Sequence, residues 1–259
     1  MDYTSNLTNE QWAIIEPMLP NNKGRGRPLK TNMREVIDGI NYLLKTGAQW
    51  RNLPSNFPKY QTVYHHFNKF KKSGLWRDIN DKLAEQIREN AGRNKTPTAA
   101  IIDSQTVKTT AYARKEDIGF DCAKKTKGKK RHIAVDVLGM ILAIVITSAG
   151  IADHKEASSF LGKLFKKFSS IKLVWADGGY HKTSLIDDIK NIWNKILEIV
   201  KRPRNTQGFK VLQWRWIVER TFGWLSNFRR LSKDYERMDD TTVSWMYIAM
   251  INIMTARMI

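Results

Sequence analysis

Apolar residues recur along this chain with two different periods, and the change of period divides it into two parts. Up to about residue 92 they recur every three or four positions, which predicts short amphipathic helices. Beyond about residue 97, short apolar runs and alternating segments are interspersed with helical ones, which predicts strands and helices in turn. We therefore expect a helical domain over residues 1–95 and an α/β domain over residues 96–259.

The first part predicts four helices separated by turn residues. Thr8 can cap the first, Thr31 opens the second, and glycines follow the second, third and fourth. The expected helices cover residues 8–19, 31–46, 60–72 and 75–91. Short helices joined by tight turns in a basic segment suggest a helix-turn-helix-like module.

The second part predicts five strands and four helices. The strands are expected at 99–103, in a hairpin over 131–150 that turns near Gly139, at 171–177 and at 196–200. The helices are expected at 154–168, 182–194, about 211–228 and 241–258. This order fits an α/β fold, an RNase H-like mixed five-stranded sheet with flanking helices, preceded by an all-α helix-turn-helix-like domain.

Charge narrows the class of partner. The chain has 44 Lys and Arg against 25 Asp and Glu, a net charge of +19, where about 2–8 is usual for the surface of a small domain. Such a surplus favours a polyanion such as nucleic acid. One cysteine excludes a disulfide framework, and the histidine spacing excludes a structural zinc site. The apolar runs are shorter than the ~20 residues of a membrane span, so we expect a soluble, cytoplasmic protein.

Three acids stand in distinctive surroundings. Asp103 follows AAII, Asp177 follows LVWA and precedes two glycines, and Glu219 lies in the aromatic helix pattern RWIVERTFGW. Carboxylates at strand ends project into the crevice where α/β sheets bind ligands. Each acid alone has a simpler interpretation: a turn residue before glycine for the Asp residues, or a solvated pair with Arg215 for Glu219.

Together, the three acids predict a two-metal phosphate site. Two Mg²⁺ ions about 3.5–4 Å apart can activate a nucleophile and stabilise the leaving oxygen of a phosphodiester, and Mg²⁺ prefers carboxylate oxygens. Mn²⁺ can substitute. Asp103 is our choice for the bridging ligand, because its strand is expected to be central in the sheet.

The motifs resemble the DDE transposases of bacterial and archaeal insertion sequences, in particular the insertion-sequence-five group. The resemblance covers nearly the whole chain, through TGAQWRNLP, IIDSQTVK, KGKKRHIAVDVLG, WADGGY and RWIVERTFGWLSNFRRL. It implies that Asp103, Asp177 and Glu219 are the catalytic metal ligands and that Arg215 is the family's basic residue before the Glu. Related groups carry a downstream Lys where this chain offers Arg229 and Arg230.

The resemblance also implies an activity. A transposase would bind the terminal inverted repeats of its element as a dimer on double-stranded DNA, cut to leave a 3′ hydroxyl, and join that hydroxyl to target DNA. It would work in the prokaryotic cytoplasm, associated with the nucleoid. Two alternatives remain open: a non-catalytic DNA-binding regulator derived from a transposase, and a related nuclease without strand transfer.

Several basic segments are candidates for DNA contact, each with a solvated surface as the alternative. The run 124–131 with His132 could follow the backbone, Arg25 and Arg27 resemble a minor-groove hook, and the polar side of helix 60–72 could read bases. The candidate residues are Arg25, Arg27, Gln61, Lys69, Lys124, Lys125, Lys127, Lys129, Lys130, Arg131, His132, Arg215, Arg229 and Arg230.

Two further acids are interpreted structurally. Asp153 and Glu156 have the spacing of a capping box, so Asp153 is expected to cap a helix, and Asp136 is expected to belong to the hairpin. The last helix is apolar on most faces and should form core or a self-association surface.

Overall fold

The computed structural model describes residues 3–20, 31–200 and 214–259, and the chain packs into two compact units. The helical unit contains the chain up to Leu83 together with Leu225–Ser232 and Ser244–Ile259. The sheet unit contains Ala84–Trp224 and Lys233–Val243. These units describe packing, and the division into functional domains at residue 95 stays a prediction.

The helical unit contains the helices that the apolar period predicts. They are α1 (Asn9–Ile15), α2 (Met33–Thr46), α3 (Tyr60–Ser73), the first part of α4 (Leu75–Asn90) and the second part of α8 (Asp239–Thr255), with short 3₁₀ turns at Glu16–Met18, Trp50–Asn52 and Arg229–Leu231. Thr8 caps α1 in a capping box with Gln11. The cap of α2 is Asn32 and not Thr31, because the Asn32 side chain accepts the N–H of Arg34.

The second part of α8 belongs to the core of the helical unit. Trp245 is fully buried, and its ring stacks on that of Phe67 with centroids 4.6 Å apart. The guanidinium of Arg230 lies 4.5 Å from the same ring centroid and donates to the carbonyl of Ala48 at 2.9 Å. Residues from near the end of the chain therefore complete a core that the N-terminal helices begin.

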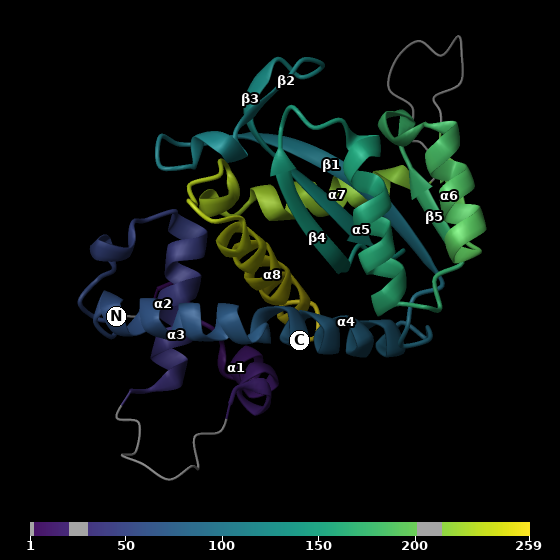
Figure 1. The fold of residues 1–259 in the computed structure, drawn as a ribbon. Helices are drawn as coiled ribbons and strands as arrows, with labels where there is room; N and C mark the ends of the chain where they lie inside the picture. Colours follow the sequence, from purple (N-terminus) through teal and green to yellow (C-terminus); the bar gives the residue numbers. More distant parts are fainter. Residues whose placement is uncertain (1–2, 21–30, 201–213) are drawn as a thin grey trace. The chain divides into compact units, whose positions relative to one another are not determined.

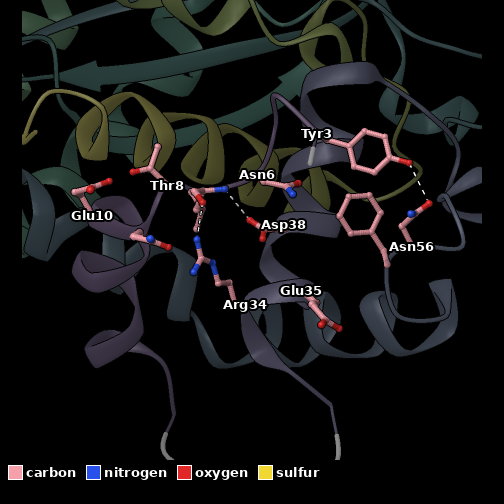
Figure 2. Close-up of a pocket in the computed structure, with 11 residues that line it drawn as sticks. Tyr3, Asn6, Thr8, Glu10, Arg34, Glu35, Asp38 and Asn56 are labelled. Carbon is pink, nitrogen blue, oxygen red and sulfur yellow. Dashed lines mark hydrogen bonds between the residues drawn. The ribbon is translucent and has the colours of Figure 1, made fainter. Parts of the chain in front are cut away.

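A pocket of about 780 Å³ lies in the helical unit, where α1 and α2 meet the first residues of the chain (Figure 2). Its polar groups already bond one another. Asp38 accepts the N–H of Leu7 at 2.8 Å, and Arg34 donates to the Leu7 carbonyl at 2.9 Å. These side chains tie the N-terminal segment to α2, which explains why polar groups line the pocket. Asp103, Asp177 and Glu219 are not among its lining residues.

The sheet unit is built on a six-stranded mixed sheet (Figure 1). Its strands are β1 (Ala99–Lys108), β2 (Gly119–Asp121), β3 (Thr126–Val135), β4 (Ile141–Ser148), β5 (Leu173–Ala176) and β6 (Ile196–Ile199). The strand order is β2-β3-β1-β5-β6, and β4 also pairs with β3. β3 runs antiparallel to β1, β2 and β4, whereas β1, β5 and β6 are mutually parallel. The predicted mixed sheet with flanking helices is confirmed, and β2 adds a short sixth strand.

Helices cover both faces of this sheet. In Figure 1, α5 (Asp153–Lys167) lies in front of the sheet and α7 (Arg215–Ser226) passes behind it, while α6 (Thr183–Trp193) lies beside β5. The core beneath α5 and α6 includes Ala100 and Ile102 of β1, Ala134 of β3 and Phe160 of α5. Alternate residues of β1 therefore face α5 (Ala100, Ile102), and those between them face the side of α7. Short 3₁₀ turns lie at Lys115–Asp117 and Gly178–Tyr180.

Two sequence predictions change in the structure. β1 does not end at Asp103 but continues to Lys108, because β3 pairs with it as far as Gly128. Asp153 does not cap α5: the cap is Ala152, without a side-chain bond. Asp136 is a hairpin residue, as predicted, and it also accepts a hydrogen bond from Arg88 at 2.6 Å. Residues 211–213 of the predicted helix 211–228 lie outside the described residues.

Candidate active site

The register of the sheet brings Asp103 and Asp177 together. In the parallel pair of β1 and β5, Ile101 lies opposite Trp175. Asp103 and Asp177 each come two residues later, so they share a level and a face, because side chains on a strand repeat every second residue. This is the face of α7, and β1 is central, with β3 on one side and β5 on the other.

Each Asp carboxylate uses one oxygen to hold its local backbone. Oδ1 of Asp103 accepts the N–H of Ser104 at 2.7 Å, and Oδ1 of Asp177 accepts the N–H of Gly179 at 2.9 Å. The turn-residue interpretation of Asp177 is therefore correct as far as it goes. Burial, followed by the charge of Asp177, raises the pKa of Asp103 to about 6.

The second oxygens face a shared cation, the guanidinium of Arg215. Its Nη2 lies 3.6 Å from Oδ2 of Asp103, 3.9 Å from Oδ2 of Asp177 and 3.3 Å from Oε1 of Glu219. The three acids that the sequence singled out therefore surround one point. The Glu219 side chain is 52% exposed, because α7 turns Val218 and Phe222 toward the core instead.

The donor set fits a hard divalent cation in its chemistry. Carboxylate oxygens from β1, β5 and α7 converge, and all three side chains reach solvent, with 13%, 29% and 52% exposed. Within the described ranges, no three His, Cys, Asp or Glu side chains stand close enough to form a ready-made metal site. Arg215 lies between the acids, so metal ions would have to displace its guanidinium.

The structure corrects the prediction that the run 124–131 with His132 follows the DNA backbone. Lys129, Lys130, Arg131 and His132 are all at least nine-tenths buried, because β3 is paired on both edges and covered on both faces. Lys129 pairs with Asp239 at 2.6 Å, and Lys130 pairs with Asp153 at 3.0 Å. These four residues are therefore internal and are not available to contact DNA.

The other basic candidates divide by exposure. Arg230 is buried against Trp245 and is therefore also unavailable to DNA. Arg25 and Arg27 lie outside the described residues. The exposed candidates are Gln61, Lys69, Lys124, Lys125, Lys127 and Arg229.

A cleft of about 440 Å³ adjoins the two Asp residues. The sequence did not indicate that Asp153 and Gly179 would also line it. Asp103, Asp177 and Gly179 line it together with Asp153 and Lys124. A side chain at position 179 would begin within about 3 Å of carboxylate oxygens of both Asp153 and Asp177, so only glycine fits there. The D-G-G-Y sequence could have indicated this close approach, since two glycines after a strand-end acid are typical of tightly packed backbone.

Two family models match the chain. The first, described as "Putative transposase of IS4/5 family", matches residues 7–80. The second, described as "Transposase DDE domain", matches residues 94–254, which is more than half of the chain and contains all three acids. The chain belongs to the DDE transposase family.

Individual relatives agree with this family. A "Putative transposase for insertion sequence element IS402" of Burkholderia cepacia is 31% identical over 124 residues, covering 44% of this chain and 56% of that relative. An IS402 protein of 16.2 kDa from the same organism is 28% identical over 116 residues, covering 42% of this chain and 77% of that relative. The chain thus spans little more than half the length of the first relative.

One solved structure covers most of the chain at low similarity. A pre-cleavage Mos1 transpososome aligns over 92% of this chain and 80% of its own chain, with 10% identity and a TM-score of 0.32. At this level the alignment adds nothing to the assignment, which rests on the family models. No helix in the described parts of the chain is long and apolar enough to cross a membrane.

Proposed function

We propose that this chain is a DNA transposase of an insertion sequence, with Asp103, Asp177 and Glu219 as its catalytic carboxylates. It binds the terminal inverted repeats of its element, cuts the DNA to a 3′ hydroxyl, and joins that hydroxyl to target DNA. The observation that carries the proposal is the convergence of all three acids on the Arg215 guanidinium inside the region that matches the DDE domain.

The electrostatics of the site support a role for divalent cations. Two Asp carboxylates at the same level of neighbouring strands repel each other, and the raised pKa of Asp103 reflects this together with its burial. A pair of Mg²⁺ or Mn²⁺ ions would relieve that repulsion and would supply a nucleophile and a stabilised leaving oxygen near neutral pH. Asp103, Asp177 and Glu219 would hold these ions, with Asp103 the most buried of the three ligands.

The residues then have distinct tasks. Asp103 and Asp177 hold fixed positions, because each accepts a nearby backbone N–H, that of Ser104 and that of Gly179 respectively. Glu219, on the exposed side, closes the site. Once displaced from the carboxylates, Arg215 can pair with a DNA phosphate, since a guanidinium matches phosphate oxygens in a two-pronged geometry.

Both chemical steps are displacements at phosphorus. In the first, a water oxygen forms a bond to phosphorus as the bond to O3′ breaks; water loses a proton and O3′ gains one. In the second, the new 3′ hydroxyl loses its proton as its oxygen bonds to a target phosphorus, and the displaced target O3′ takes up a proton. The same three carboxylates serve both steps. We further propose a dimer on DNA, with residues 1–95 contributing the DNA-binding module.

The test is DNA cleavage and joining by the full chain on a duplex that carries the element's ends. We expect Mg²⁺- or Mn²⁺-dependent nicks that leave 3′ hydroxyls, and target-joined products. Asp103→Ala, Asp177→Ala and Glu219→Ala should each lower the rate by at least 10³-fold, while Lys69→Ala, remote from the acids in sequence, should retain the chemistry at saturating DNA.

The outcomes separate the three candidate functions. Cleavage without joined products would indicate a nuclease. Binding to the ends without any metal-dependent cleavage would indicate a regulator. Cleavage by the three Ala variants at the wild-type rate would show that the acids are not the site.

A further inference from the structure

A buried group of hydrogen bonds lies on the α5 face of the sheet, directly beneath the two Asp residues. Ser104 follows Asp103 in β1 and therefore points to the opposite face, where its hydroxyl donates to Oδ1 of Asp153 at 3.0 Å. Tyr180, three residues after Asp177, is fully buried, and its hydroxyl is hydrogen-bonded to His132, the residue of β3 that pairs with Ser104. The neighbours of the two acids thus meet at the same place on β3.

The Tyr180 hydroxyl is held by β3 and, through His132, by β4. His132 places Nδ1 3.2 Å from the Tyr180 hydroxyl and Nε2 3.0 Å from the hydroxyl of Thr147. His132 and Thr147 are both buried. Burial lowers the pKa of His132 to about 4, so the ring is neutral at physiological pH, with one nitrogen donating and the other accepting.

Asp153 anchors the Ser104 side of this group. Its carboxylate accepts from both the Ser104 hydroxyl and the Lys130 ammonium, each at 3.0 Å. Lys130 and His132 both belong to β3. The residue after Asp103 and the turn after Asp177 are therefore held to one strand, the first through Asp153 and the second through His132.

From this arrangement we propose that Tyr180 and Ser104 are positioning residues: the Tyr180–His132 and Ser104–Asp153 hydrogen bonds, both tied to β3, set the spacing between Asp103 and Asp177. Tyr180 cannot touch metal or DNA, because it is fully buried, so it acts through the backbone of the turn that carries Asp177. The 3₁₀ turn Gly178–Tyr180 follows Asp177 directly, and the shift of its last residue would move the carboxylate.

This inference rests on the proposed metal-binding role of the acids, and its test therefore reads metal binding without DNA. Mn²⁺ binding to the full-length protein is measured by electron paramagnetic resonance for wild type, Tyr180→Phe, Ser104→Ala and Asp103→Ala. We expect Tyr180→Phe and Ser104→Ala each to weaken Mn²⁺ affinity about 10-fold, the low end of the range for groups that orient metal ligands. In a cleavage assay the same variants should need about 10-fold more Mn²⁺ and should approach the wild-type rate at saturating metal.

A matched control separates positioning from stability. Tyr247→Phe removes another buried phenol hydroxyl, in the helical unit, and should leave Mn²⁺ affinity unchanged even if it lowers the melting temperature. Wild-type Mn²⁺ affinity in folded Tyr180→Phe would overturn the inference, and if that variant does not fold, wild-type affinity in Ser104→Ala would do so. A rate loss that saturating Mn²⁺ does not restore would also overturn it.

The two proposals fail differently. If wild type binds Mn²⁺ through Asp103 but does not cut DNA, the proposed function is wrong, and the affinities of Tyr180→Phe and Ser104→Ala still decide the positioning role. If Asp103→Ala binds Mn²⁺ as well as wild type, both proposals are wrong.

Discussion

The basic run from Lys124 to Arg131 falls into two halves with opposite environments. Lys124, Lys125 and Lys127 are exposed, whereas Lys129 and Arg131 are buried. The difference arises because β3 pairs only with the short β2 at Lys127 but with both β1 and β4 from Lys129 onward. Cations that look equivalent in sequence therefore serve different purposes: the first half is available to a polyanion, and the second half stabilises the sheet unit.

Each buried cation of β3 has an internal partner. Which side of the sheet that partner lies on follows from the cation's position in the strand. Lys130 points to the α5 side and reaches Asp153, whereas Lys129 and Arg131 point to the other side and reach Asp239 and the Lys233 carbonyl. A buried charge is tolerated only when it is paired and hydrogen-bonded. The second half of the run thus ties β3 to the segments around it.

The largest expected effect is on stability, from Lys129→Ala. The substitution removes a fully buried stem and an ion pair of 2.6 Å. Loss of a buried pair costs about 3–5 kcal/mol, but Asp239 is 39% exposed and can regain water, so we expect about 2–3 kcal/mol. Urea unfolding measures it, with Lys127→Ala as the matched exposed control. Equal unfolding midpoints for the two variants would contradict the division of the run.

The next effect is on DNA affinity, from combined Ala substitution of Lys124, Lys125 and Lys127. If each neutralises one phosphate, the salt dependence of binding should fall in slope by roughly 2.7 and the affinity at 0.15 M salt by on the order of 100-fold. Fluorescence anisotropy over a salt series measures both. Unchanged slope with a folded variant would show that the exposed half does not face DNA.

A third effect concerns acid. Burial lowers the folded-state pKa of His132 to about 4, with Asp153 opposing the shift and Lys130 and Lys124 adding to it; the ordinary value is about 6.5. Between these values the unfolded chain binds a proton that the folded chain does not. Stability is therefore complete above about pH 6.5 and falls as pH drops toward 4, by up to about 1.4 kcal/mol per pH unit from this residue.

Urea unfolding from pH 7 to pH 4.5 checks this effect in wild type and His132→Gln. The variant should be less stable at pH 7, because its bonds to Tyr180 and Thr147 change, but it should lose less on acidification. Parallel pH profiles for the two proteins would mean that His132 does not titrate as a buried neutral ring.

The smallest effect is that of Lys127→Ala alone. Its side chain is exposed, so the free energy of unfolding should change by less than about 0.5 kcal/mol. Thermal melting followed by circular dichroism is sufficient. A larger loss would mean that the boundary between the two halves lies earlier in the run.

Periodicity and turn residues determined most of the fold. The helices and strands lie where the apolar patterns place them, since each pattern buries one face of one kind of element. The ends of the helices and strands were less well determined. β1 extends five residues beyond Asp103 because its partner β3 is long enough to pair there, and the sequence of β1 does not indicate that pairing.

The acids of the site were identifiable from sequence because of their settings, strand-end motifs and an aromatic helix. Their convergence required the tertiary structure. Parallel pairing of Ile101 with Trp175 aligns Asp103 with Asp177, and α7 brings Arg215 and Glu219 across the same face. The roles of Asp153 and Tyr180 were also inaccessible, because they depend on contacts between residues far apart in the chain.

Local pattern and composition were sufficient to place the helices and strands, to show the excess of positive charge and to select the three acids as candidates. Which cations are exposed, which carboxylate oxygens share Arg215, and which side chains lie beneath the acids depended on how the chain folds. Burial and strand register depend on pairing partners, and a residue's exposure follows from what covers its face rather than from its own chemistry.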